Sequence, residues 1–391
     1  MKFSVSSNIE QVHFPPISEV KSWIAGRTFP PERPLVDLCQ AIPDYPPPPE
    51  LIAHLKPLLD DPLTSKYSPD EGLPEVRAAV CAWYARHYGA APRPSEICLT
   101  IGASQAFWLA VTVLCRAGDE VILQLPAYFD HPMALQALGI RCVYASFAEA
   151  CGGLPDVEAI ASLITAKTRA ILLVTPSNPT GAIIPPATIR RLLELARQRN
   201  VALVLDETYN AFLPSGAAPH DLFADPAWSD HFVHLASFGK TFAMTGYRAG
   251  ALVASERFIH HALKVQDTMA VCQPRITQHA VRYGCERLDG WVAANGAMMQ
   301  QRHDRFREEF QKSGNPFRLA ASGAFFAWVR HPFPAESSRS IARRLATEAN
   351  VLCLPGEVFG PGLEKYLRLA FGNITEAAVP EAVRRFREFQ I

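Results

Sequence analysis

The sequence predicts an α/β protein: a large domain with a mostly parallel seven-stranded sheet flanked by helices, and a smaller α+β domain formed by both termini. Two observations support this prediction. Short apolar runs alternate with helical patterns through the middle of the chain, and the pattern changes in the last third. In addition, 391 residues exceed what one ordinary core accommodates, so two domains are expected.

Seven candidate strands lie in the middle of the chain. Several are nearly continuous apolar runs, which is typical of strands buried on both faces, and helical stretches between them indicate crossover connections. The expected strands span residues 97–101, 120–125, 141–144, 170–175, 202–206, 232–236 and 249–253. The expected helices span residues 103–117, 132–138, 157–166 and 186–198.

The last third of the chain predicts the smaller domain. Short strands are expected at 325–329, 351–354 and 366–370, with helices at 338–350 and 376–389. The proline run at 46–49 indicates a stiff connector between domains. We therefore expect a large domain at 46–275 and a small domain made of 1–45 with 276–391.

Composition excludes several classes of function. The formal net charge is +0 and no basic run stands out, so nucleic-acid binding is not indicated. The longest apolar stretch, 106–115, is too short to span a membrane, and the N-terminus lacks a secretory pattern. Nine cysteines without a Cys-x-x-Cys pair argue against a metal site or a disulfide framework and predict reduced thiols in the cytoplasm.

Lys240 is the most informative residue of the chain. It lies three residues after Ser237 and eight before Arg248, and Gly246 and Gly250 flank that arginine. An amine in this setting can form a Schiff base with an aldehyde cofactor, while Ser237 and Arg248 can bind a nearby phosphate. Lysine is much rarer than arginine in this chain, so an incidental surface lysine is the less favoured alternative.

Further polar residues follow predicted strands, where ligands of open α/β sheets bind. Asp206 ends one strand, and a carboxylate there can keep a pyridine nitrogen protonated. Tyr209 and Asn178 can hydrogen-bond the phenolic oxygen of such a ring. Single residues leave two alternatives open, a helix N-cap for Asp206 and a plain Asn-Pro turn for Asn178.

Three aromatic or turn segments add weaker signals. The turn at Gly102-Ala103-Ser104 follows a strand and opens a helix, so its backbone N–H groups can bind an anion. Tyr128 can stack on a flat cofactor, with a core aromatic residue as the equal alternative. Tyr67 can donate its hydroxyl to a phosphate. His131 follows Tyr128 closely and can face the pocket, but a histidine at the start of a helix is the favoured alternative.

These motifs together resemble the class I/II aminotransferases, enzymes of fold type I that use pyridoxal 5′-phosphate (PLP), over nearly the whole chain. The Asn178 turn, the Asp206-x-x-Tyr209 strand end, the Lys240 motif and a late Arg368 occur in the family's order. The resemblance implies that Lys240, Asp206 and Tyr209 are catalytic and that Arg368 and Asn178 bind the substrate. It also implies a homodimer in which Tyr67 serves the neighbouring subunit's phosphate.

Two departures from the family pattern bear on the substrate. Ala41 stands where the family often has glycine, which narrows the space beside the substrate. Ser104 stands where some aspartate-type members carry a lysine, so an acidic amino donor is disfavoured unless Arg27 or Arg275 enters the site.

The sequence therefore predicts a ping-pong transfer of an α-amino group to a 2-oxo acid, with a neutral or aromatic amino donor favoured. A PLP-dependent lyase or cyclase is the alternative on the same fold, because the site residues are shared. A non-catalytic, ligand-sensing domain of a transcription regulator is the remote alternative, since no helix-turn-helix pattern precedes the large domain.

Overall fold

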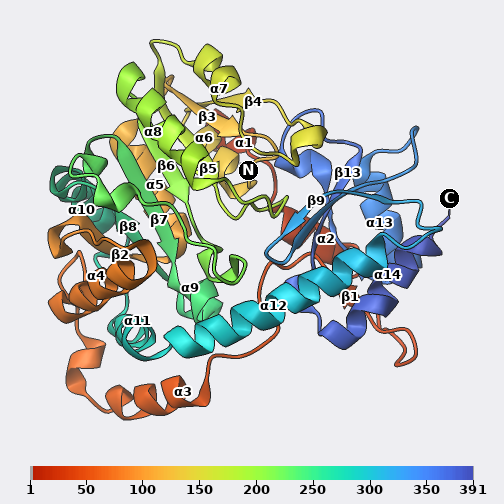
Figure 1. Cartoon of the computed structure of the whole chain (residues 1–391), viewed down its shortest axis with the longest axis horizontal. Helices are drawn as coiled ribbons and strands as arrows, with labels where there is room; N and C mark the ends of the chain where they lie inside the picture. The colour runs from red at the N-terminus through yellow and green to blue at the C-terminus, as the bar shows by residue number, and fades with distance from the viewer. Residues whose placement is uncertain (1–2, 391) are drawn as a thin grey trace.

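The computed structural model describes residues 3–390. A seven-stranded sheet in the order β2-β8-β7-β6-β5-β3-β4 forms the centre of the large domain (Figure 1). Every strand except β8 runs in the same direction, because β8 pairs antiparallel with both β2 and β7. The strands are β2 (Ile97–Ile101), β3 (Glu120–Gln124), β4 (Arg141–Ala145), β5 (Thr168–Val174), β6 (Ala202–Asp206), β7 (Phe232–Ser237) and β8 (Ala249–Val253).

Helices cover both faces of this sheet. Successive strand residues point to opposite faces, so Leu203 and Leu205 join one core while Val204 joins the other. One face packs against helices α5 (Gly102–Leu114), α6 (Asp130–Ala137) and α10 (Glu256–Ala270). The opposite face packs against helices α4 (Pro74–Tyr88), α7 (Val157–Leu163), α8 (Pro186–Arg199) and α11 (Arg275–Arg287). The mostly parallel sheet and its helices confirm the predicted fold class.

The small domain is built on a four-stranded antiparallel sheet in the order β12-β13-β10-β9. Its strands are β9 (Arg318–Gly323), β10 (Phe326–Arg330), β12 (Leu354–Pro355) and β13 (Tyr366–Ala370). Helices α13 (Ser338–Glu348) and α14 (Val379–Arg387) contribute to its core. The N-terminal segment joins this domain, because β1 (Val36–Asp37) pairs in parallel with β11 (Val351–Leu352).

The long helix α12 (Asp289–Phe310) connects the two domains (Figure 1). Its first turns pack against the large-domain core through Trp291 and Val292, and its later turns place Phe306 and Phe310 in the small-domain core. Helix α11 also packs its apolar side chains into the large-domain core. We therefore propose that the large domain continues through α11 into α12, beyond the boundary at residue 275 expected from the sequence.

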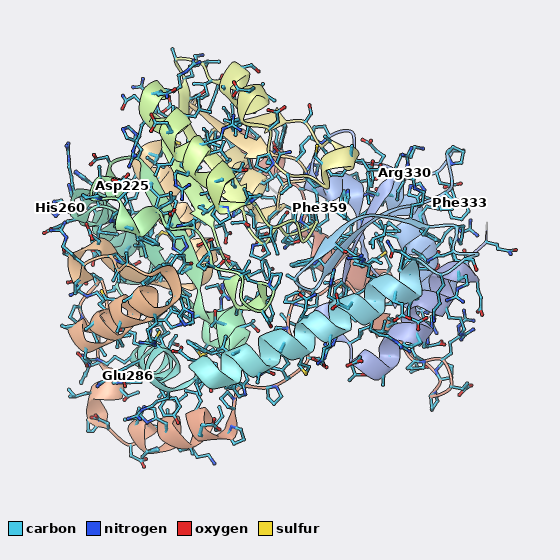
Figure 2. The ribbon with its side chains drawn as sticks, in the orientation of Figure 1. Asp225, His260, Glu286, Arg330, Phe333 and Phe359 are labelled. Carbon is cyan, nitrogen blue, oxygen red and sulfur yellow. The ribbon has the colours of Figure 1, made fainter. Side chains whose placement is uncertain are left out.

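The outer surface is polar around these cores. Figure 2 shows the exposed side chains of His260 and Glu286 on the large domain and of Arg330 on the small domain. Within residues 3–390, no helix combines the length and the apolar character needed to cross a membrane. The nine cysteines are all free thiols.

Candidate active site

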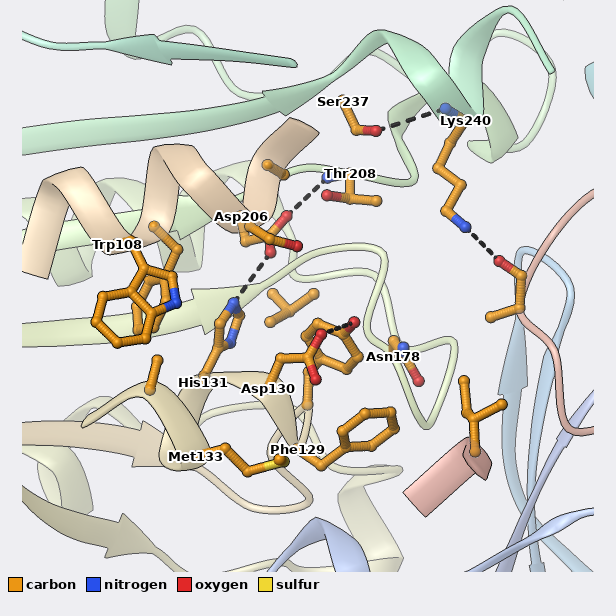
Figure 3. A pocket seen from close by; sticks show the side chains of 18 of the residues that line it. Trp108, Phe129, Asp130, His131, Met133, Asn178, Asp206, Thr208, Ser237 and Lys240 are labelled. Carbon is orange, nitrogen blue, oxygen red and sulfur yellow. Dashed lines mark hydrogen bonds and ion pairs between the residues drawn. The ribbon is translucent and has the colours of Figure 1, made fainter. Parts of the chain in front are cut away.

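A cavity of about 500 Å³ lies at the carboxyl ends of the parallel strands, where the small domain and the N-terminal segment close over the large domain. Figure 3 shows side chains from several elements converging on it. Every predicted site residue except Tyr67 lines it: Ala41, Ala103, Ser104, Tyr128, Asn178, Asp206, Tyr209, Ser237, Lys240, Arg248 and Arg368.

Lys240 reaches into the cavity from α9 (Phe238–Thr241), a short helix that begins directly after β7. The Ser237 hydroxyl caps this helix by accepting the Lys240 backbone N–H at 3.4 Å. The Lys240 Nζ donates to the backbone carbonyl of Ala41 at 2.6 Å (Figure 3). Burial, together with the positive charges of Arg248 and Arg368, lowers the pKa of this amine to about 7. A large fraction of the amine is therefore neutral, and hence nucleophilic, near neutral pH.

An anion cradle lies at the N-terminus of α5. Ala103 and Ser104 in the first turn of this helix line the cavity together with Ser237 and Arg248, and the Arg248 guanidinium lies beside Gly102. Gly102 has a φ of +75°, and a Cβ at this position would collide with the Arg248 guanidinium. The absence of a side chain at Gly102 thus lets Arg248 lie against the helix N-terminus, which suits a phosphate group.

Asp206 ends β6 with its carboxylate in the cavity. Its Oδ1 accepts the Thr208 backbone N–H at 2.9 Å, and its Oδ2 lies 3.2 Å from the His131 Nε2 (Figure 3). His131 is the second residue of α6, as expected for a helix-start histidine, but it is also buried and supports the carboxylate. Sequence reasoning missed this second role, because the contact joins residues from different elements.

Asn178 and Tyr209 lie together on the opposite side of the cavity, with the Asn178 Nδ2 3.5 Å from the Tyr209 hydroxyl oxygen. The Asn178 Oδ1 is buried and has no hydrogen-bond partner in the described chain. Burial raises the pKa of the Tyr209 phenol, so it remains a hydrogen-bond donor. The turn after Asn178 contacts the small domain, where a Cβ on Gly181 or Gly323 would collide with the facing backbone.

Arg368 projects from β13 of the small domain and is 1% exposed. One of its nitrogens donates to the Cys39 carbonyl at 2.5 Å, but Nε and Nη1 have no partner among the described residues. The aromatic rings of Phe326 and Phe359 lie 5.7 and 5.8 Å from its guanidinium carbon. Burying unpaired N–H donors is costly, so this guanidinium is prepared for a carboxylate ligand.

The remaining predicted residues lie at the edges of this arrangement. The Tyr128 ring lines the cavity, and its hydroxyl donates to Asp130 Oδ2 at 2.5 Å. Tyr67 is 77% exposed and lies outside the cavity of its own chain. Sequence reasoning did not single out several other lining residues, namely Val12, Gln40, Phe107, Trp108, Phe129, Asp130, Met133, Ala134, Ala137, Val174 and Thr208.

These residues fit pyridoxal phosphate. The anion cradle suits its phosphate, and the low-pKa amine of Lys240 suits its aldehyde. Asp206 suits its ring nitrogen, and the unpaired amide oxygen of Asn178 and the Tyr209 hydroxyl supply polar groups beside the ring. The unpaired donors of Arg368 suit a substrate carboxylate.

Comparison with known proteins identifies the family of the chain. A family profile described as aminotransferase class I and II matches residues 33–386. The aromatic aminotransferase ISS1 of Arabidopsis thaliana is 29% identical, over 96% of this chain and 93% of the relative's length. An aspartate aminotransferase of Sulfurisphaera tokodaii is 30% identical, over 85% of this chain and 84% of its own.

Solved structures give the same result. The aspartate aminotransferase of Thermus thermophilus with maleate superposes with a TM-score of 0.89 at 25% identity, covering 98% of this chain and 99% of the other. Motif order, cavity geometry and likeness to known proteins therefore converge. The chain belongs to the class I and II aminotransferases and is a PLP-dependent aminotransferase of fold type I.

Proposed function

We propose that this enzyme takes the α-amino group from a neutral or aromatic amino acid and passes it to a 2-oxo acid by a ping-pong mechanism. The distribution of positive charge in the cavity carries this proposal. Lys240, Arg248 and Arg368 are the lysine and arginine residues among the described lining. Because the first two face the cofactor, only Arg368 remains for a carboxylate, and one carboxylate is what a neutral amino acid offers.

The walls of the cavity support the same donor class. Val12 and Ile17 of the N-terminal segment, with Phe129 and Met133, provide apolar surface. Asp130 adds negative charge that would repel an acidic side chain. The named relatives include both aspartate and aromatic aminotransferases, so the pocket itself is what favours the neutral or aromatic class.

The two arginines that could have reversed this preference make other contacts. Arg27 donates to the Ala346 carbonyl at 2.9 Å and to the Asn350 side chain at 3.2 Å, both in the small domain. Arg275 donates to the Tyr67 carbonyl at 2.9 Å. Neither lines the cavity of its own chain.

The chain's own groups provide the steps of the reaction. Bound pyridoxal phosphate supplies an aldehyde that takes up amino groups and a ring that withdraws electrons from the substrate Cα. Arg368 and Asn178 hold the substrate carboxylate and so fix the orientation of the Cα–H bond. The neutral amine of Lys240 would take the proton from the substrate Cα and pass it to the cofactor carbon that carries the aldehyde, and the reverse transfer would protonate Cα of the product made from the 2-oxo acid. Asp206 keeps the ring nitrogen protonated, and the apolar walls exclude water.

A homodimer with shared sites and a cytoplasmic location complete the proposal. Exposed apolar side chains accompany Tyr67 on the chain surface, namely Leu59, Leu63 and Met269. The contact between Arg275 and the Tyr67 carbonyl fixes this tyrosine on the outside, where a second copy can use it. Nine free thiols favour a reducing compartment.

The half-reaction tests the donor class. The PLP-loaded enzyme is mixed with single amino acids without any 2-oxo acid, and the cofactor absorbance is followed. We expect phenylalanine or leucine to bleach the colour at least about tenfold faster than aspartate at equal concentration, because aspartate brings an unpaired second charge. Preferred bleaching by aspartate would contradict the proposed donor class. Release of ammonia with retained colour would instead identify the lyase alternative.

A further inference from the structure

A buried polar cluster lies behind the turn that carries Asp206 and Tyr209. Its centre is Glu207, which is 4% exposed and follows Asp206 directly in the chain. Since neighbouring residues at a strand end point in opposite directions, Glu207 faces away from the cavity and is not among its lining residues. The cluster also contains Tyr84, Tyr88, Asn210, His220 and His234.

One oxygen of Glu207 has several donors around it. Its Oε2 accepts the Tyr88 hydroxyl at 2.6 Å, the His234 Nε2 at 2.7 Å and the Asn210 Nδ2 at 3.1 Å. The His220 Nε2 lies 3.4 Å from the same oxygen. These donors and the neighbouring imidazoles hold the pKa of Glu207 well below its usual range, despite burial. The cluster therefore contains an ionised carboxylate.

Both histidine rings of the cluster turn Nε2 towards Glu207. The Leu222 backbone N–H donates to His220 Nδ1 at 3.2 Å, which leaves the proton of the neutral ring on Nε2. The Tyr84 hydroxyl lies 2.8 Å from His234 Nδ1, while His234 Nε2 lies 2.7 Å from Glu207 Oε2. Glu207, His220 and His234 also lie close enough together to hold a metal ion, so the zinc content of the purified protein decides between the two roles.

Two of the donors come from segments that also carry active-site residues. His234 lies on β7, which ends at Ser237 and leads into the helix of Lys240. Asn210 follows Tyr209 and begins the 3₁₀ turn η5 (Asn210–Phe212). Tyr88 is the last residue of α4. Glu207 therefore connects the ends of two neighbouring strands to a helix at the back of the site.

We propose that Glu207 is a positioning residue for the transamination site: its carboxylate fixes the turn after β6, so that Asp206 and Tyr209 keep their places in the cavity. The inference rests on the PLP chemistry of the site but not on the identity of the amino donor. It assigns the cluster a role in cofactor retention and orientation, in addition to any role in stability.

A Glu207→Gln variant tests this proposal, with Glu120→Gln as its matched control. Glu120 is also buried, at 3% exposure, but lies at the first residue of β3, at the opposite end of the same sheet. It accepts the Thr165 hydroxyl at 2.6 Å and pairs with Arg141 at 3.2 Å. Both variants are measured for thermal stability without cofactor, for the dissociation constant of PLP, and for the pH midpoint of the bound-cofactor absorbance.

We expect both variants to melt at lower temperature, but only Glu207→Gln to weaken PLP binding, by about tenfold or more, and to shift the absorbance midpoint. Tyr88→Phe removes one hydrogen-bond donor to Glu207 while keeping the aromatic ring. It replaces Glu207→Gln in the same measurements if that variant does not fold. It should change the same two readouts in the same direction by a smaller factor. Unchanged PLP affinity and midpoint in a folded Glu207→Gln or Tyr88→Phe protein would overturn the positioning role. Stoichiometric zinc bound by the wild type and lost in these variants would also overturn the assignment of the cluster.

Discussion

Asp206 and Glu207 are adjacent buried acids whose surroundings differ in one decisive respect. Asp206 lies 3.2 Å from one ionisable side chain, that of His131, and beside a cavity of about 500 Å³. Glu207 has donors from three side chains within hydrogen-bonding distance of one oxygen and does not line that cavity. A buried carboxylate that can accept further hydrogen bonds and lies beside a cavity is available to a ligand. A buried carboxylate whose oxygen already accepts several hydrogen bonds instead holds the structure in place. We propose that Asp206 serves the reaction and Glu207 supports the fold of the turn because of this difference.

The largest expected effect comes from replacing a residue that lines the cavity, as Asp206 does. Lys240→Ala should lower turnover by about 10⁴-fold or more, because the amine that links to the cofactor and moves the Cα proton is lost. Steady-state kinetics measure the loss, and PLP binding should persist in part through the anion cradle. Lys264→Ala, an exposed lysine on α10, is the control and should retain normal turnover. Near-normal turnover of Lys240→Ala would refute the assignment of its role.

Exchanging each of the two acids for its amide sharpens the comparison. Asp206→Asn should lower kcat by about 10²- to 10³-fold with little change in the melting temperature of the cofactor-free protein. Its amide oxygen can still accept the Thr208 N–H, and the adjoining cavity leaves room for the extra donor. Calorimetry and kinetics on Asp206→Asn and Glu207→Gln measure both quantities. If the melting temperature falls equally in the two variants, the proposed difference between the roles of Asp206 and Glu207 is wrong.

Arg368 resembles Asp206 in being a buried charged residue that can make further hydrogen bonds, because two of its nitrogens have no partner among the described residues. Arg368→Lys should raise the KM for the amino acid and for the 2-oxo acid by about tenfold or more, because an ammonium cannot make the paired contact of a guanidinium. The dissociation constant of PLP should change little. If the KM values stay constant while the affinity for PLP falls, Arg368 binds the cofactor and not the substrate.

The last expected effect concerns the pH dependence of stability in the cofactor-free protein. The folded-state pKa of Lys240, about 7, lies below its unfolded value of 10.5, so the unfolded chain binds more protons between these values. The destabilisation is therefore complete below about pH 7 and disappears as the pH rises towards the unfolded pKa. Lys240→Met should stabilise the protein by a few kcal/mol at pH 6 and by much less near pH 10. Denaturation at several pH values measures this difference, and a difference independent of pH would contradict the lowered pKa.

Much of the cavity could be predicted from the sequence, because its residues lie in local motifs at strand ends. Asn178, Asp206 and Lys240 each follow an apolar run that ends at the same edge of a parallel sheet. The Glu207 cluster could not be predicted in this way. Its donors come from α4, from β7 and from the chain between them, and no sequence spacing indicates that they meet.

Two features of the fold escaped prediction for related reasons. The strand β9 (Arg318–Gly323) contains small and polar residues and is only partly buried, so it lacks an apolar signature. Helix α11 is amphipathic, but amphipathicity reveals a buried face without showing which domain buries it. Tertiary contacts decide both cases.

Locating the cofactor on the chain tests the account most directly. The PLP-loaded enzyme is treated with borohydride, which reduces and so fixes the covalent link, and the digested protein is analysed by mass spectrometry. We predict that the cofactor mass is found on the peptide containing Lys240, and on no other peptide once excess PLP has been removed. Stoichiometric attachment to another lysine, or no attachment in an active enzyme, would contradict the site described here.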